Sequence, residues 1–135
     1  MTLLFPFRPA AEVDDALLAD LRDFFARVES FEVAFDRVGR FEEVAYLAPE
    51  PAKPFVELTL ALVARYGYLP YGAEFDEIVP HLTIVNRAPP ALLDEVEREL
   101  AGELPIRARA TEAALLEEGA DGVWRPRAGF TLGSG

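Results

Sequence analysis

The feature that most constrains the fold of this 135-residue chain is an order of predicted elements that occurs twice. The first half reads as a strand over residues 2–7, a helix over 14–28 and strands over 31–35 and 44–47. The second half reads as a strand over 81–85, a helix introduced by the Pro89-Pro90 pair, and strands over 106–116 and 123–132. Strands joined by short turns, expected here near Gly39 and over residues 119–122, pair antiparallel. This order predicts an α+β fold of two pseudo-symmetric lobes, each an antiparallel sheet with helices on the outside.

Hydrophobic periodicity supports the helices and suggests how the chain is divided. Apolar residues recur at three- and four-residue spacing over 14–28, as on one face of a helix. A further helix begins at Pro54, whose fixed φ suits a first helical position. We expect a single domain, with lobe one at about 1–50, a connecting helix and loop at about 51–78, and lobe two at about 79–133.

The stretch over residues 67–77 lacks clear periodicity and leads directly into the strand at 81–85. It carries Tyr71 and Phe75 among glycines and a proline. Loops of this length in a compact domain are often functional. Two interpretations stay open: these aromatic residues line a binding site, or they cap the end of a sheet.

Composition excludes several classes of function. The chain has no cysteine and a single histidine, so a disulfide framework, a thiolate nucleophile and a zinc site are not expected. We expect no cofactor. No apolar run is long enough to span a membrane and no signal segment opens the chain, so we expect a cytoplasmic protein without a membrane partner. A net charge of −11 argues against binding to long nucleic acid, but is compatible with a small phosphate ester.

The residues best suited to a catalytic role are His81 and Thr83, in the sequence Pro-His-Leu-Thr-Ile. Positions two apart on a strand point to the same face, so an imidazole and a hydroxyl should lie side by side. Thr2 occupies an equivalent place at the start of the first strand. A single histidine in an apolar strand is often a core residue, but the threonine and the second strand favour an imidazole that acts as an acid or a base.

These residues and their placement resemble the 2H phosphoesterase superfamily, which includes 2'-5' RNA ligase-like proteins and RNA cyclic phosphodiesterases. The family is defined by two His-x-Thr/Ser motifs, one per lobe, that face each other across a central groove. Residues 80–85 match the second motif, and residues 2–7 match the remainder of the first, with Met1 in its variable place. The resemblance implies a metal-independent enzyme that acts on a 2',3'-cyclic or 2'-5' phosphodiester of a nucleotide or an RNA end.

In this resemblance one histidine acts as base and the other as acid, while threonine hydroxyls donate to the non-bridging phosphate oxygens. His81 then supplies one acid/base group, Thr83 and Thr2 bind phosphate, and the histidine of the first motif is absent from the chain as written. Either this chain is a degenerate member with impaired activity, or its start was placed too late. We favour the second explanation, because a GTG valine codon inside the motif can be read as a start.

Further residues are candidates for lining the groove: Tyr46, Tyr71, Phe75, Arg87, Arg125 and Arg127. Tyr46 is equally well explained as a half-buried strand residue, and Arg125 and Arg127 as charges that protect an edge strand. The alternative function is a non-catalytic module that retains the groove and binds a nucleotide or a protein. A plain structural domain, in which His81 only packs, is a third interpretation. The sequence makes no prediction about the oligomeric state.

Overall fold

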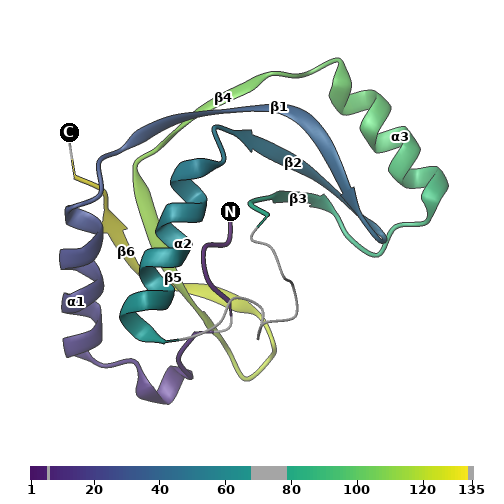
Figure 1. The fold of residues 1–135 in the computed structure, drawn as a ribbon. Coiled ribbons are helices and arrows are strands. Elements are labelled where there is room, and N and C mark those ends of the chain that lie inside the picture. Colours follow the sequence, from purple (N-terminus) through teal and green to yellow (C-terminus); the bar gives the residue numbers. More distant parts are fainter. Residues whose placement is uncertain (6, 68–78, 134–135) are drawn as a thin grey trace. The chain divides into compact units, whose positions relative to one another are not determined.

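The computed structural model describes residues 1–5, 7–67 and 79–133 and shows an α+β fold (Figure 1). The elements follow in the order η1 (Ala10–Glu12), α1 (Asp15–Ala26), β1 (Phe31–Phe41), β2 (Val44–Glu50), α2 (Lys53–Tyr66), β3 (Leu82–Val85), α3 (Pro90–Ala101), β4 (Ile106–Ala110), β5 (Glu112–Glu118) and β6 (Trp124–Thr131). The strands form a four-stranded sheet in the order β3-β2-β1-β4 and a two-stranded sheet of β5 and β6. The predicted fold class, with antiparallel sheets and helices, is confirmed.

The chain divides into two compact units. Unit 1 consists of Met1–Phe7 and Val33–Ala108, and it contains β2, β3, α2, α3 and most of β1. Unit 2 consists of Arg8–Glu32 and Arg109–Gly135, and it contains α1, β5 and β6. The lobe boundaries expected from the order of elements stay a prediction. No helix in the described part of the chain is long and apolar enough to cross a membrane.

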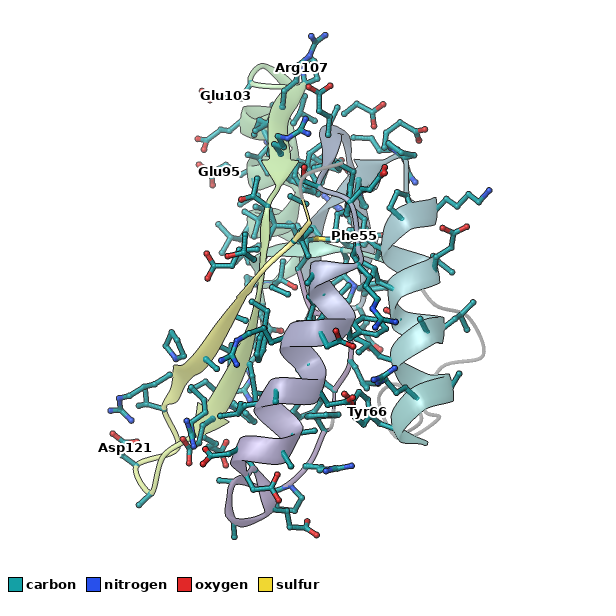
Figure 2. The ribbon with its side chains drawn as sticks, turned by 90° about the vertical axis from the view of Figure 1, so that its left-hand side faces the viewer. Phe55, Tyr66, Glu95, Glu103, Arg107 and Asp121 are labelled. Atoms are coloured by element: carbon teal, nitrogen blue, oxygen red, sulfur yellow. The ribbon has the colours of Figure 1, made fainter. Side chains whose placement is uncertain are left out.

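In unit 1, helix α3 covers one face of the four-stranded sheet. Ala45, Ala88 and Leu93 are buried together between them, and partly buried valines of β1, β3 and α3 pack around these three residues. Above this core, the Arg40 guanidinium on β1 donates to the Asp94 carboxylate on α3 over 2.6 Å. The acidic side chains of α3 are exposed, as is Glu103 after it, and Figure 2 shows Glu95 and Glu103 pointing outward.

In unit 2, helix α1 packs on the hairpin of β5 and β6. Asp14 caps the helix because its carboxylate accepts from the Leu17 amide over 2.8 Å. The buried face of the helix follows the predicted periodicity and includes Leu17, Leu21 and Phe25. The Phe25 ring stacks on Phe130 of β6 with ring centroids 5.8 Å apart. The helix predicted over 14–28 is therefore confirmed to within two residues at its C-terminal end.

Three local predictions were wrong. The turn expected near Gly39 lies at residues 42–43, where Glu43 adopts a left-handed φ of 61°, and β1 continues through Gly39 to Phe41. The long strand expected over 106–116 is broken at Thr111, whose carbonyl accepts from the Leu132 amide, so two strands form in its place. The third correction concerns the first residues of the chain.

The strand expected over residues 2–7 does not form in the described part of that segment. Instead, the Leu3 carbonyl accepts a hydrogen bond of 2.6 Å from the hydroxyl of Thr59 on α2. Thr59 is 3% exposed, so its hydroxyl needs an internal partner. Phe7 also packs edge-on against Tyr66 of the same helix, at a centroid distance of 5.3 Å. Contacts with side chains of α2, in place of the expected strand pairing, therefore hold this segment.

We predict that Thr59→Val destabilises the protein by about 1–3 kcal/mol, because the Leu3 carbonyl loses its donor while the side-chain volume is nearly unchanged. Thr59→Ser is the matched control, since it retains the hydroxyl. Urea unfolding measures the stability, and the amide signals of residues 2–5 report whether the segment detaches. Equal stability of the Val and Ser variants would show that this hydrogen bond does not anchor the segment.

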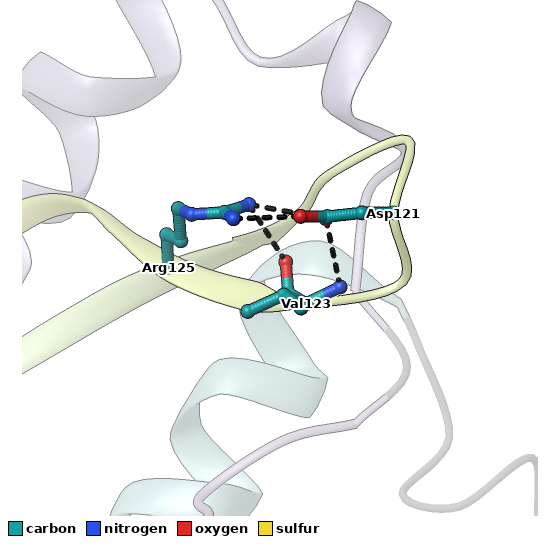
Figure 3. A network of polar contacts seen from close by, with 3 residues as sticks. All are labelled: Asp121, Val123 and Arg125. Atoms are coloured by element: carbon teal, nitrogen blue, oxygen red, sulfur yellow. Dashed lines mark hydrogen bonds and ion pairs between the residues drawn. The ribbon is translucent and has the colours of Figure 1, made fainter.

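The turn between β5 and β6 gives a second prediction, which concerns pH. The Asp121 carboxylate accepts from both terminal nitrogens of Arg125, over 2.7 and 3.2 Å, and from the Val123 amide over 3.1 Å (Figure 3). The hydrogen bond from Arg125, followed by that from Val123, lowers the pKa of Asp121 below its ordinary value. A lowered carboxyl pKa stabilises the folded turn above the unfolded pKa of about 3.9, and this stabilisation is lost as the pH falls through the folded value.

We therefore expect the turn to loosen only in strongly acidic solution, as measured by the chemical shift of the Val123 amide along a pH titration. Asp121→Asn keeps an acceptor for that amide but has no charge to lose, so its titration should be flat over this range. A transition at or above the ordinary aspartate pKa in the unmodified chain would contradict the assignment.

Candidate functional site

His81 lies one residue before β3, in unit 1, and its ring is half-buried. Its Nδ1 is 2.8 Å from the carbonyl oxygen of Val79. A carbonyl can only accept, so Nδ1 carries the hydrogen and Nε2 is the basic nitrogen of the neutral ring. A backbone carbonyl that holds one imidazole nitrogen in this way fixes the tautomer, which is what an acid/base histidine requires.

Two aromatic rings of the neighbouring strands contact the imidazole. The rings of Phe41 and Tyr46 stack on each other, with centroids 4.6 Å apart and an interplanar angle of 23°. The His81 ring meets Phe41 at 5.2 Å and 87°, and Tyr46 at 5.7 Å and 69°. Edge-to-face contacts of this kind are favourable and directional. We call the stacked rings of Phe41 and Tyr46 the aromatic wall.

The aromatic wall depends on Gly39 of β1. Gly39 is the register partner of Tyr46 in the β1–β2 pair, and the Tyr46 ring lies across it. A Cβ at position 39 would overlap Cζ, Oη and Cε2 of that ring. Glycine in a strand interior often marks such a close approach, and an aromatic ring over a strand glycine is a known stabilising arrangement. The absence of a side chain at position 39 is thus what admits the Tyr46 ring.

Thr83 reaches the same side of the sheet as the aromatic wall. It is the register partner of Tyr46 across the β2–β3 pair, so the two side chains share a face. The next pair is Ala45 with Val85, which leaves Ile84 as an extra residue on β3. This bulge turns Val85 toward the core under α3 while Thr83 keeps the opposite face. The sheet therefore presents the Thr83 hydroxyl on the same face as the rings that contact His81.

Thr2 is exposed and lies in the segment that forms no strand. Its expected place on a strand equivalent to β3 is therefore wrong, although unit 1 includes both Thr2 and Thr83. The neighbouring Leu3 is held by Thr59, as described above. A shared role of the two threonine hydroxyls in phosphate binding stays a prediction.

The remaining predicted site residues differ in their surroundings. Tyr46 is only 8% exposed, so it is a packed ring. Phe41 is 38% exposed, and no pattern in the sequence indicated it as a site residue. Arg87 is exposed and follows β3 with a left-handed φ of 57°. Tyr71 and Phe75 lie outside the described residues.

Two predicted arginines lie on β6 of unit 2, and acidic groups neighbour both. The Arg125 guanidinium is bound to Asp121 and also donates to the Val123 carbonyl. Arg127 lies 3.8 Å from the Glu117 carboxylate of β5. These contacts stabilise the hairpin, and phosphate binding by either arginine stays a prediction. Among residues 1–5, 7–67 and 79–133, no group of three or more His, Cys, Asp or Glu side chains is arranged to hold a metal ion.

Comparison with known proteins identifies the family of the chain. A search of curated proteins finds no match. The sequence model of the family described as the 2'-5' RNA ligase superfamily matches residues 1–122, which is most of the chain and includes His81, Thr83 and both strands of the aromatic wall. On the extent of that match, the chain belongs to the 2'-5' RNA ligase superfamily, within the 2H phosphoesterases.

Proposed function

We propose that this protein is a metal-independent phosphoesterase that opens a 2',3'-cyclic phosphate or cleaves a 2'-5' phosphodiester, with His81 as an acid/base group. The observation that carries the proposal is the hydrogen bond from Nδ1 of His81 to the Val79 carbonyl. It fixes the tautomer of the neutral ring, so Nε2 is the nitrogen that is proposed to act as the base. Family membership supports the reaction class.

Thr83 is proposed to donate its hydroxyl to a non-bridging phosphate oxygen. Charge develops on these oxygens as the attacking group approaches, and a fixed donor stabilises it. The exposed position of Thr83 on the face of Tyr46 leaves it accessible to a ligand on that side of the sheet. Since the net charge is −11, we propose a small nucleotide or an RNA end as substrate, and not long nucleic acid.

We predict that His81→Asn lowers the rate of hydrolysis of a nucleoside 2',3'-cyclic phosphate by about 10²–10⁴-fold, the usual contribution of an acid/base group. Asparagine can still donate to the Val79 carbonyl, so the local backbone should be preserved. Binding of the cyclic nucleotide, measured by calorimetry, should change far less than the rate. Full activity of this variant would refute the assignment of His81.

We predict that Thr83→Val lowers kcat by at least about tenfold, because it removes one donor to the phosphate. Thr83→Ser should retain most of the activity. Thr131→Val is the matched control, because Thr131 is also an exposed strand threonine but lies on β6. If the Val variants at positions 83 and 131 behave alike, Thr83 has no role in phosphate binding.

The second acid/base group that the family resemblance implies would be a histidine immediately before Met1. We predict that an N-terminal extension placing histidine there increases the rate and changes the pH profile from a single limb to a bell, since one group must then be neutral and the other charged. The assay compares the chain, the extended chain and the extended chain with His81→Ala. An unchanged rate on extension would refute this source of the second group.

The alternative is a non-catalytic module that binds a nucleotide or a protein. It is favoured by one observation, that the chain contains a single imidazole. The same experiments separate the two functions. A module shows no turnover of the cyclic nucleotide, either with or without the extension, and His81→Asn then changes at most the affinity for its ligand.

A further inference from the structure

We propose that Gly39, Phe41 and Tyr46 are positioning residues that hold the imidazole of His81 in one orientation, with Gly39 acting through the Tyr46 ring. The inference rests on the proposed function for its catalytic consequence. Its structural part, the control of the ring by the aromatic wall, is tested independently of any activity.

The first step is the position of His81 in the chain. The residue precedes β3, and its hydrogen bond to Val79 joins two positions of one short segment. A bond within the segment fixes the ring relative to that segment, but not relative to the sheet. The edge-to-face contacts with Phe41 and Tyr46 join the ring to β1 and β2. These contacts therefore fix the position of the imidazole relative to the face on which Thr83 lies.

The second step is the rigidity of the aromatic wall. Tyr46 is 8% exposed and is paired on both sides, with Gly39 of β1 and Thr83 of β3. Its ring occupies the volume that any larger residue at position 39 would need. Phe41 stacks on the ring from two residues further along β1. Because a Cβ at position 39 would overlap the Tyr46 ring, the ring or its strand must shift, and with it the surface that His81 contacts.

The third step is the sensitivity of acid/base chemistry to placement. A displacement of about 1 Å at a reacting group can lower a rate by about 10²-fold, even when the substituted residue is remote from the chemistry. Gly39 contributes no side chain and cannot touch substrate through one. A loss of kcat on its substitution, with KM nearly constant, would therefore report misplacement of another group.

The single histidine makes a direct test available, because ¹⁵N spectra of the imidazole contain signals of His81 alone. When the ring is neutral, its spectrum should show one protonated nitrogen, Nδ1, and one unprotonated nitrogen, Nε2. We expect Gly39→Ala to mix the two tautomers or shift both signals, and to lower kcat by about 10–100-fold with KM within about threefold. Gly102→Ala is the matched control, because a Cβ there meets nothing closer than 3.7 Å and its φ is −76°.

Substitutions in the aromatic wall provide the second arm. Tyr46→Phe retains the ring and should preserve the His81 signals, whereas Tyr46→Leu and Phe41→Leu should alter them. If Gly39→Ala does not fold, the His81 signals of Phe41→Leu test the positioning role in its place. Signals equal to those of the unmodified chain in Gly39→Ala, or in Phe41→Leu when the first variant is unfolded, would overturn the proposal.

The two proposals fail in different ways. If the Gly39→Ala signals change while kcat does not, the catalytic part of the positioning role is overturned. If His81→Asn also retains full activity, the proposed function itself has failed, and the control of the ring by the aromatic wall stands only as a property of the fold.

Discussion

The close contact between Gly39 and Tyr46 is the interaction on which the candidate site depends. It places an aromatic ring across a neighbouring strand, on the face opposite the core formed with α3. Phe41 stacks on this ring, and the imidazole of His81 meets both. A residue with no side chain thus admits the buried phenol ring that the imidazole of His81 contacts.

A bulge at Ile84 sets which side chains of the four-residue strand β3 lie on each face of the sheet. Without the extra residue, Thr83 and Val85 would point the same way, because side chains alternate along a strand. With it, Val85 packs under α3 and Thr83 shares the face of Tyr46. Bulges often re-aim side chains near functional sites. Here the core contact and the candidate phosphate contact come from adjacent pairs of one short strand.

The sequence was informative where structure depends on local periodicity, and misleading where it depends on a distant partner. The helix after Asp14 was predicted because its buried residues recur at helical spacing. Gly39 was misread as a turn, since glycine in a strand marks either a turn or a close approach, and only the Tyr46 partner distinguishes them. The segment at Thr2 was misread as a strand because its hydrogen bond goes to the Thr59 side chain, 56 positions away from Leu3. The spacing of His81 and Thr83 predicts that they share a face, which stays a prediction, and nothing in the sequence indicated the contact between Phe41 and His81.

The charges of the described side chains bear on the size of the proposed substrate. On β6, Arg125 and Arg127 have carboxylate neighbours, so these guanidinium groups are already partly neutralised. The face of unit 1 with the aromatic wall carries the Thr83 hydroxyl, which is an uncharged donor. An uncharged hydroxyl binds phosphate through direction and distance, and it attracts a polyanion poorly over long range. For the proposed reaction, recognition must then come from contacts with one phosphodiester and its immediate neighbours, which favours a short ligand whose phosphate can be placed close to Nε2 of His81.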